Sequence, residues 1–543
     1  MTEQQKIFAR QVEEALLDLG AEDMRLIMDG AHPSWDFNFL GYGTSWPLKL
    51  KPIGWDFHNL PTIYWCSGSP IWGWPHISTD GDICVSDREG LEYDPDDILG
   101  VLQWLLCEAT RLLAEGASMP EKKRRELFAD ELEGYLDNCG AGSVQLDSPL
   151  NTEAALYAEV ELHKQGYLKI TPIVRRINFG TAELPKCQQQ RIGYIDVTIH
   201  ALSELRQTID ATWWEGFLKH LTPEQRSVAT LPRNRGLILR VLTSYGHASV
   251  LLYWGVRARA KKWFATAYLL KRQDREYLIQ RTGGVVVKKH IIIVGCGSIG
   301  SRVAEHLALG GISKLTLVDY DRFTADNLGR HILGKESISK YKVDSIAKLL
   351  ESRVPGIEVI PKPIPVQTLL TNGALSQADV IILATGNSVL ERAIVRRAYQ
   401  EKWHCLIVSS SVEAGGLGGH AIAMKPGTPG CLDCLYIDLD TQQPISGMTT
   451  ALAAPGQKVT KQLTGCGAFT PYSAIDATRT ALLAVERALA ESTAYSRWAG
   501  EGTVAEAEGI VPSETYFALR AGRISAELSS AVFAQPRCKC CSV

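Results

Sequence analysis

The sequence has little cysteine for its length, almost no net charge and no long hydrophobic run. Thirteen cysteines in 543 residues are too few for a disulfide-stabilised scaffold. The net charge of −3 argues against bulk binding to nucleic acid or to an anionic membrane, and we expect neither partner. The apolar runs fall short of the roughly 18 residues that a membrane-spanning helix needs, and the start, MTEQQKIFARQVEE, lacks a signal-peptide pattern. We therefore expect a cytoplasmic protein whose reduced thiols are candidate metal ligands or nucleophiles.

Length and composition predict a globular protein with several domains. The chain is 45% hydrophobic and 22% charged, and at roughly 150 residues per domain its length predicts three to four domains. We expect an α+β domain over residues 1–145, an α+β middle domain over residues 146–285 and an α/β domain over residues 286–543. The middle region contains alternating apolar stretches but no recognisable set of catalytic or metal-binding residues.

The first region combines helical and strand-like segments. Apolar residues at helical spacing predict helices over residues 5–19, 96–114 and 121–135. Six of the 13 tryptophans lie between the first two helices, in a glycine- and proline-rich segment with strand-like runs at 48–53 and 62–66. We interpret these tryptophans as core and turn residues rather than as a ligand-binding set.

The third region opens with the pattern of a nucleotide-binding α/β sheet. After the strand-like run HIIIV, Gly295, Gly297 and Gly300 form a G-x-G-x-x-G turn before a helix. Glycines at these positions permit a tight turn and a close approach of the backbone to phosphate at the helix N-terminus. Asp319 ends the next strand, 24 residues after Gly295, where a ribose-binding acid is expected. The later runs ADVIILATG and CLIVSSS predict further buried parallel strands.

Polar and charged residues follow the second of these strands. Asp321, Asn327, Arg330 and Lys342 supply a carboxylate, an amide, a guanidinium and an ammonium, which together suit a triphosphate and its metal ion. The alternative is a surface loop with a helix-capping asparagine and paired charges. A dehydrogenase would share the glycine turn but would not need the last three of these residues, so we favour a site for nucleotidyl transfer.

The run from Gly295 to Lys342 resembles the adenylation domain of the ThiF family, which includes the ubiquitin-activating enzymes. The resemblance implies a Rossmann-like fold, a homodimer and ATP-dependent adenylation of the C-terminal carboxylate of a ubiquitin-like protein. It also implies that Asp319 holds the ribose of ATP, while Asn327, Arg330 and Lys342 face the phosphates.

The sequence departs from this family at the expected magnesium ligand. Gly386, in the run LATGN, stands where the family has an Mg²⁺-binding aspartate. Either Asn387 or Asp321 then supplies the contact to Mg²⁺, or adenylation is weakened. Arg392, in the helix that follows, fits the family pattern, and Arg275 and Arg281 are further candidates to reach a partner's nucleotide.

Cys431, Cys434, Cys538 and Cys541 form two C-x-x-C pairs. Four thiolates in two such pairs make a tetrahedral structural Zn²⁺ site, and the ThiF resemblance places zinc pairs at matching points. Cys540 is an alternative fourth ligand, and a redox pair is the alternative to zinc. A closed four-sulfur site has no open coordination position, so we assign it no catalytic role.

Cys466 lies in the run TGCGAFTPY, where flanking glycines and a following proline predict an exposed loop. A helix that begins near Ser473 would favour the thiolate through its dipole. In activating enzymes a loop cysteine takes the adenylated carboxylate as a thioester, and we assign that role to Cys466. The alternative is a small residue in a tight turn.

Cys84 ends the segment PHISTDGDIC, which resembles the active-site run of ubiquitin-conjugating enzymes, H-P-N-I-x-x-x-G-x-I-C. The resemblance implies that Cys84 accepts a thioester and passes the acyl group to an amine, and two helices after the cysteine agree with that fold. His76 stands in place of the family's asparagine, where it could donate the same hydrogen bond or act as a base. Asp82 or Asp94 could orient the incoming lysine. The alternative for Cys84 is a buried core thiol.

The remaining cysteines are expected to pack as small apolar residues. They are Cys66, Cys107, Cys139, Cys187, Cys296 and Cys405.

Together, the two ends of the chain resemble the fused conjugating–activating proteins of bacterial antiphage operons, closest to the type found in cyclic-oligonucleotide (CBASS) systems. The resemblance implies that ATP activates a partner protein's C-terminal carboxylate, that Cys466 and then Cys84 carry it as a thioester, and that a target lysine finally attacks. In the CBASS group the conjugated protein is a cGAS-like nucleotidyltransferase. The alternatives are the same chemistry on a ubiquitin-like protein from another bacterial conjugation operon, a sulfur-carrier adenylyltransferase, or a dehydrogenase with an inert N-terminal module.

Overall fold

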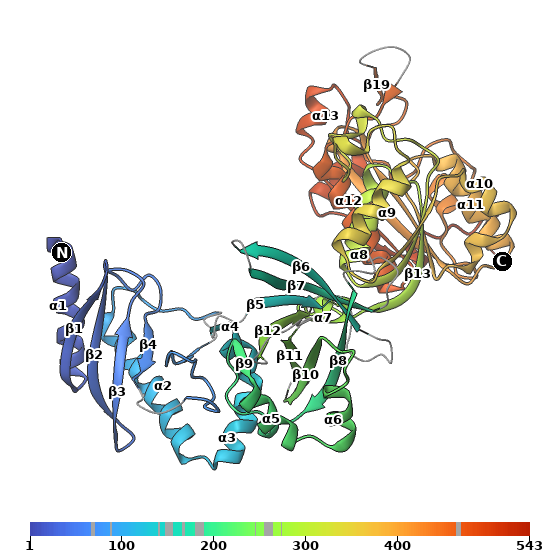
Figure 1. Cartoon of the computed structure of the whole chain (residues 1–543). Helices are drawn as coiled ribbons and strands as arrows, with labels where there is room; N and C mark the ends of the chain where they lie inside the picture. Colours follow the sequence, from blue (N-terminus) through green and yellow to red (C-terminus); the bar gives the residue numbers. More distant parts are fainter. Residues whose placement is uncertain are drawn as a thin grey trace. The chain divides into compact units, whose positions relative to one another are not determined.

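The chain forms two compact units in its computed structural model, Met1–Arg272 and Gln273–Val543 (Figure 1). The structure describes residues 1–66, 71–86, 90–138, 142–146, 156–165, 169–179, 189–244, 246–254, 264–272, 274–462 and 468–542. None of the helices in these ranges combines the length and the apolar character that crossing a bilayer requires.

The first unit begins with helix α1 (Glu3–Asp18) and a four-stranded antiparallel sheet in the order β1-β2-β3-β4. The strands are β1 (Ala21–Asp29), β2 (His32–Gly41), β3 (Thr44–Lys51) and β4 (Thr62–Trp65). Helix α2 (Ile98–Ser118) follows, and its apolar face shares one core with α1 and the sheet, with Leu16, Trp35 and Leu105 fully buried. The helices predicted over 5–19 and 96–114 are therefore confirmed as α1 and α2.

The first unit continues with a second sheet, in the order β11-β10-β8-β6-β7-β5-β12-β9, and β11 also pairs with β12. Its strands are β5 (Gly142–Leu146), β6 (Leu156–Gln165), β7 (Lys169–Phe179), β8 (Gln189–Val197), β9 (Thr208–Asp210), β10 (Gly236–Thr243), β11 (Gly246–Tyr253) and β12 (Phe264–Arg272). Helices α5 (Ala211–Lys219) and α6 (Pro223–Ala229) lie between β9 and β10 in the chain. This mixture confirms the α+β class expected of the middle region.

The helix predicted over 121–135 is divided in the structure. A 3-10 turn at Ala129–Glu131 separates α3 (Glu121–Phe128) from α4 (Leu132–Asn138). Phe128 and Leu132 are fully buried against side chains of the second sheet, so this segment packs with the middle region rather than with α1 and α2. The two compact units do not divide residues 1–272 further, and the boundary near residue 145 stays a prediction.

The second unit is built on a mixed sheet in the order β15-β14-β13-β16-β17-β18-β21-β22. Its strands are β13 (Val287–Val294), β14 (Ile312–Val318), β15 (Glu358–Lys362), β16 (Val380–Leu383), β17 (Leu406–Val412), β18 (Gly418–Met424), β21 (Ala494–Ala499) and β22 (Glu527–Ser529). The strands from β15 to β17 are mutually parallel, and the last three are added antiparallel. The parallel α/β sheet predicted for this region is confirmed.

Helices cover both faces of this sheet. The helices of this unit are α7 (Arg275–Gln280), α8 (Ser298–Leu309), α9 (Lys342–Arg353), α10 (Val366–Thr371), α11 (Ser388–Gln400), α12 (Ala474–Ala490), α13 (Thr503–Ala507), α14 (Glu514–Arg520) and α15 (Ser530–Phe533). The unit also has a small pair of strands, β19 (Lys461–Gln462) and β20 (Ala468–Phe469). Alternate residues of β13 point to opposite faces, so Ile291 and Ile293 pack with α8, α9 and α12, while Ile292 and Val294 pack with α10 and α11 (Figure 1).

The order of the strands identifies where a ligand site is expected. The chain leaves β13 for β14 on one side and later returns to β16 on the other side. Ligands of open α/β sheets bind outside the carboxyl ends of the strands at such a switch point. Gly295 follows β13 directly and Ala384 follows β16, so the glycine turn lies at this point.

Candidate functional site

The three glycines of the turn are required for different reasons. Gly295 has a φ of +86°, and a Cβ there would lie 2.6 Å from the carbonyl oxygen of Ala384. A Cβ on Gly300 would lie 1.8 Å from the carbonyl oxygen of Gly295. A Cβ on Gly297 would meet nothing within 4 Å. The first and third glycines therefore permit close packing, and the second leaves open space at the N-terminus of α8, where backbone N–H groups favour an anion.

A cavity of about 1020 Å³ opens in front of this turn. Four of the predicted residues, Gly297, Asp321, Asn327 and Arg330, line it together. The rest of the lining comes from the ends of β16 and β17 and from later loops. It includes Thr385, Gly386, Glu391, Ser409, Ser410, Glu413, Tyr436, Met448, Val459, Phe469 and Tyr472. A cavity of this size, with a few polar groups converging on it, is typical of a nucleotide-sized ligand site.

Asp319 and Lys342 support the lining rather than belonging to it. The Asp319 carboxylate accepts hydrogen bonds from the backbone N–H groups of Cys296 (2.8 Å) and Asp321 (2.8 Å), which ties the second strand to the glycine turn. Lys342 Nζ donates to Asp321 Oδ2 at 2.8 Å, and the lysine side chain is only 8% exposed. The ammonium group is therefore held beside the cavity by one carboxylate.

Arg330 and Asn327 contribute polar groups to the cavity wall. The Arg330 guanidinium lies 4.4 Å from the ring centre of Tyr472 and donates to the carbonyl oxygen of Thr470 at 3.1 Å. Asn327 Oδ1 accepts from the backbone N–H of Thr324 at 3.0 Å, so its NH₂ group is the half of the amide that could donate to a ligand. These fixed donors suit the charge of phosphate groups.

His331 also lines the cavity, and its side chain holds the glycine turn in place; no role was predicted for it from the sequence. Its Nδ1 accepts from the backbone N–H of Leu333 at 3.1 Å, so its Nε2–H donates to the carbonyl oxygen of Cys296 at 2.9 Å. Burial lowers the pKa of His331 to about 4, which keeps the ring neutral. Its position directly after Arg330 was the sequence signal that could have identified it.

Two glutamates in the cavity lining, the buried Glu391 and the partly buried Glu413, were also missed. Glu391 accepts hydrogen bonds from Thr385 N (2.9 Å) and Ser409 Oγ (2.6 Å), and burial raises the pKa of this carboxyl group. Burial alone would also raise the pKa of Glu413, but its hydrogen bond from His420 Nε2 (3.0 Å) helps to lower that pKa below its usual value. These partners lie on different strands and loops, so no local motif marks them.

Two of the predicted site residues, Asn387 and Arg275, have side chains with structural roles. Asn387 Oδ1 accepts from the backbone N–H of Leu390 at 3.1 Å and so caps α11, and the residue is not among those that line the cavity. Arg275 is buried and donates to the carbonyl oxygen of Ile312 within its own unit, so it does not extend towards a partner. Both side chains have structural contacts that the sequence analysis did not anticipate.

The four cysteines of the C-x-x-C pairs form one buried cluster. Their sulfur atoms all lie within 4.8 Å of one another, with Cys431–Cys538 at 3.5 Å and Cys434–Cys541 at 3.4 Å. A tetrahedral zinc ion with Zn–S bonds of about 2.3 Å requires sulfur atoms about 3.8 Å apart. The donor set is therefore compatible with zinc, and Cys541 rather than Cys540 completes it.

The loop between the first two of these cysteines contacts α11. Arg392 Nε donates to Asp433 Oδ1 at 2.5 Å, and its guanidinium lies 4.2 Å from the ring centre of Tyr436. Arg396 pairs with the same carboxylate, with Nε to Oδ2 at 2.5 Å. Arg392, which the sequence analysis associated with the nucleotide site, therefore connects the metal loop to a cavity-lining tyrosine.

In the first unit, Cys84 is exposed and lines a hollow of about 320 Å³ together with Thr62 and Asp82. Its backbone N–H donates to the carbonyl oxygen of His76 at 2.8 Å, and the N–H of Ile83 donates to Ile63 on β4 at 2.9 Å. The loop is thus held against the sheet while the thiol faces solvent. The alternative interpretation of Cys84 as a buried core thiol is wrong.

The groups proposed to assist Cys84 differ in position. Asp82 lies in the same hollow, whereas Asp94 is not among its lining residues. The contact between His76 and Cys84 is a backbone one, and His76 Nδ1 instead pairs with Glu131 Oε1 at 3.1 Å. The hydrogen bond to Glu131 raises the pKa of His76, which favours the protonated form over a general base.

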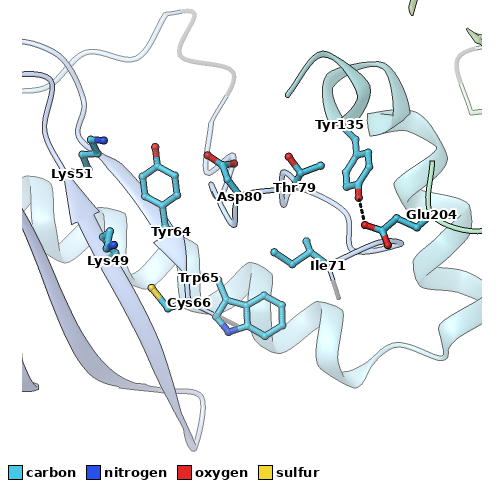
Figure 2. Close-up of a pocket in the computed structure, with 10 residues that line it drawn as sticks. All are labelled: Lys49, Lys51, Tyr64, Trp65, Cys66, Ile71, Thr79, Asp80, Tyr135 and Glu204. Atoms are coloured by element: carbon cyan, nitrogen blue, oxygen red, sulfur yellow. Dashed lines mark hydrogen bonds between the residues drawn. The ribbon is translucent and has the colours of Figure 1, made fainter. Parts of the chain in front are cut away.

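A further hollow of about 490 Å³ in this unit is lined by Lys49, Tyr64, Cys66 and Asp80, among others (Figure 2). Cys66 is exposed, as is Cys107, so the expectation that both pack as apolar residues is wrong. Desolvation and the nearby Asp36 raise the pKa of Cys66, which disfavours the nucleophilic thiolate.

The remaining cysteine predictions have different outcomes. Cys296 and Cys405 are buried as expected. Cys139, Cys187 and Cys466 lie outside the described residues.

Part of the second unit matches a known family. Residues 281–504 match the model of the ThiF family. The chain is 30% identical over 179 residues to "ATP-dependent ubiquitin transferase-like protein Cap2" of Pseudomonas aeruginosa, a match that covers 30% of each protein. It is 24% identical over 199 residues to ubiquitin-like modifier-activating enzyme 5 of Aedes aegypti, covering 33% of this chain and 49% of that one. The chain thus spans less than half the length of either relative.

Among solved structures, that of E. coli MccB shares 15% sequence identity and a TM-score of 0.34, and the match covers 49% of this chain and 68% of MccB. A score this low carries no argument about function.

Proposed function

Through residues 281–504 the chain is a member of the ThiF family, and on this premise we propose that it uses ATP to adenylate the C-terminal carboxylate of a partner protein. The observation that carries the proposal is the cavity at the switch point of the sheet. Gly297 leaves open space there at the start of α8, and Arg330 and Asn327 line the same cavity. The N-terminus of α8 and the guanidinium would bind the triphosphate, because both favour negative charge.

The ribose has a candidate partner beside the cavity, and the adenylated carboxylate has candidate partners in its lining. Asp319 accepts two backbone N–H groups through its two oxygens, and each oxygen keeps a second lone pair that could accept a ribose hydroxyl. The wall from Ser409 to Glu413, together with Met448, would contact the partner's terminal residues. A single open cavity can therefore hold both reactants, which is the main requirement for adenylation.

We assign the first thioester to Cys466. Val459 and Phe469 line the cavity and flank this cysteine in the sequence. Three residues of fully extended chain span about 11 Å, so a nucleophile three residues before Phe469 is within reach of the cavity. Attack of the Cys466 thiolate on the acyl adenylate forms the thioester and releases AMP.

We assign the second thioester to Cys84, in a ubiquitin-conjugating-like domain at the start of the chain. The support is the order helix, four-stranded antiparallel sheet, cysteine loop and helices, together with an exposed thiol beside Asp82. Transthiolation would move the acyl group from Cys466 to Cys84, and a target lysine would then attack to give an amide. A homodimer through the ThiF domain belongs to the same proposal.

The likeness to the ubiquitin transferase-like protein Cap2 of Pseudomonas aeruginosa supports conjugation of a partner protein. Within this class we favour the CBASS type, in which the activated protein would be a cGAS-like nucleotidyltransferase. The same chemistry on a ubiquitin-like protein is favoured by the likeness to ubiquitin-like modifier-activating enzyme 5. The two candidates differ in the protein whose carboxylate is activated and share every step on this chain.

The test is incubation of the full chain with ATP and each candidate partner, followed by non-reducing gels. The unmodified chain should carry a thiol-sensitive adduct. Cys84→Ala should retain an adduct at Cys466 but transfer nothing to a lysine, and Cys466→Ala should form no adduct. Cys107→Ala is the matched control, because Cys107 is also exposed in the first unit and has no assigned role. Release of pyrophosphate without any thiol-sensitive adduct would leave adenylation standing and refute the thioester relay.

A further inference from the structure

The cavity of the second unit combines a glycine turn and cationic side chains with an unusual set of acidic groups. We infer that this site binds ATP without any carboxylate of the chain on the magnesium ion, an inference that rests on the proposed adenylation. Mg²⁺ in nucleotide sites usually takes one or two protein carboxylates in addition to phosphate oxygens. Whether an acidic side chain of the cavity is available to Mg²⁺ depends on the groups that it already contacts.

Gly386 occupies the position where a carboxylate is missing. It lines the cavity with a φ of +68°, and a Cβ built on it would meet nothing within 4 Å. The space for an acidic side chain thus exists, but the chain leaves it empty. Asn387, the neighbouring candidate, uses its side-chain oxygen to cap α11.

Among the described residues, the acidic side chains that line the cavity are those of Asp321, Glu391 and Glu413. Asp321 is paired with Lys342 at 2.8 Å, and the lysine side chain is 8% exposed. This pair uses only Oδ2, and the Asp321 side chain is 50% exposed. A metal ion on the other oxygen would lie close to the Lys342 ammonium group, and the repulsion between the two cations disfavours that position. Residues 463–467, outside the described part, contain no acidic residue.

The carboxylates of the two glutamates already accept several hydrogen bonds each. Glu391 is 4% exposed, and its two oxygens accept from Thr385 and Ser409. Glu413 Oε1 accepts from His420 at 3.0 Å and from the backbone N–H of Leu452 at 3.1 Å. A metal ion would have to displace these donors and leave them unpaired in a buried site. The donor set therefore does not fit Mg²⁺.

This arrangement has a consequence for the form of ATP that binds. With Asp321 paired to Lys342 and no side chain at Gly386, the N-terminus of α8 and Arg330 face the full negative charge of the triphosphate. Metal-free ATP carries more negative charge than its magnesium complex, so these groups attract it at least as strongly. Mg²⁺ should therefore be unnecessary for binding, whereas a site with a protein carboxylate should need it.

The experiment is calorimetric titration of the full chain with ATP, without a partner protein, once in excess EDTA and once in excess MgCl₂. For the unmodified chain we expect dissociation constants that agree within about threefold, with the EDTA value the lower of the two. Gly386→Asp should weaken binding in EDTA by about tenfold or more, because it adds repulsion, and MgCl₂ should restore it. Gly386→Asn has nearly the same shape without the charge, tolerates a positive φ as well, and should behave as the unmodified chain.

Three results would overturn the inference. Binding by the unmodified chain that MgCl₂ strengthens about tenfold or more would refute it while leaving adenylation intact; loss of that effect in Asp321→Asn would identify Asp321 as the metal ligand. Equal behaviour of Gly386→Asp and Gly386→Asn would show that a carboxylate at this position does not meet the phosphates. A chain that binds no ATP under either condition would refute the proposed adenylation together with this inference.

Discussion

Acidification should lower the stability of the second unit through one buried histidine, His331. Both ring nitrogens of the neutral His331 form hydrogen bonds with backbone groups, one of them in the glycine turn, and the residue is 8% exposed. Burial lowers its pKa to about 4, whereas an unperturbed histidine titrates near pH 6.5. As the pH falls below about 6.5, His331 binds a proton in the unfolded chain but not in the folded chain. The free energy of unfolding therefore falls until the folded ring is also protonated near pH 4.

The magnitude follows from the two pKa values. A folded-state pKa of about 4 and an unfolded pKa of about 6.5 differ by about 2.5 units, or about 3.4 kcal/mol over the whole window. Between about pH 7 and about pH 5 the loss is about 2 kcal/mol, since only part of the window has been crossed. The loss should be complete near pH 4 and absent above about pH 7.

The assay is urea unfolding of the full chain at both pH values, followed by brief proteolysis and mass spectrometry of peptides from Gln273–Val543. This readout follows the second unit alone. The control is His331→Gln, which keeps an amide donor and cannot titrate, so the difference in pH dependence between the two chains isolates the histidine. An equal loss of stability in both chains between about pH 7 and about pH 5 would refute the reasoning.

Two further predictions concern the glycine turn and the cysteine cluster. Gly300→Ala should destabilise the second unit by about 1–3 kcal/mol, because its Cβ would overlap the carbonyl oxygen of Gly295, whereas Gly297→Ala should unfold close to the parent chain in the same urea assay. Cys434→Ser should abolish zinc binding measured by elemental analysis, and Cys540→Ala should retain it, because only the former residue belongs to the four-sulfur cluster. Zinc retained in Cys434→Ser, or an unchanged midpoint in Gly300→Ala, would contradict the respective argument.

The central sheet and the glycine turn could be predicted because their signals are local in the sequence. The run Ile291–Val294 is apolar at every position, as expected of a strand buried on both faces, and the glycines follow it directly. The C-x-x-C pairs could be predicted for a similar reason, since the spacing within each pair already suits one metal ion. The two pairs lie more than a hundred residues apart in the sequence. That they form one cluster was predicted from the chemistry of four thiolates and not from the fold.

Other features depend on partners that are distant in sequence and could not be predicted from spacing. The segment 121–135 has continuous helical periodicity, but Phe128 and Leu132 are buried in a sheet formed by later residues, and the chain turns at Ala129–Glu131 between them. The pairing of Glu413 with His420 needs β18 to return antiparallel beside β17. Neither arrangement has a sequence signature at the residues themselves, because tertiary packing overrides local preference.

One loop connects the cysteine cluster with the cavity at the glycine turn, although no cysteine of the cluster lines that cavity. A metal ion at the cluster would order the chain on both sides of Asp433, and this carboxylate holds Arg392 and Arg396 on α11. Arg392 in turn lies against Tyr436, which lines the cavity, and α11 begins at Ser388, two residues after Gly386. Loss of zinc in Cys434→Ser should therefore weaken ATP binding as well as stability. Unchanged ATP affinity in a metal-free chain that remains folded would show that the cavity wall is ordered by the sheet alone.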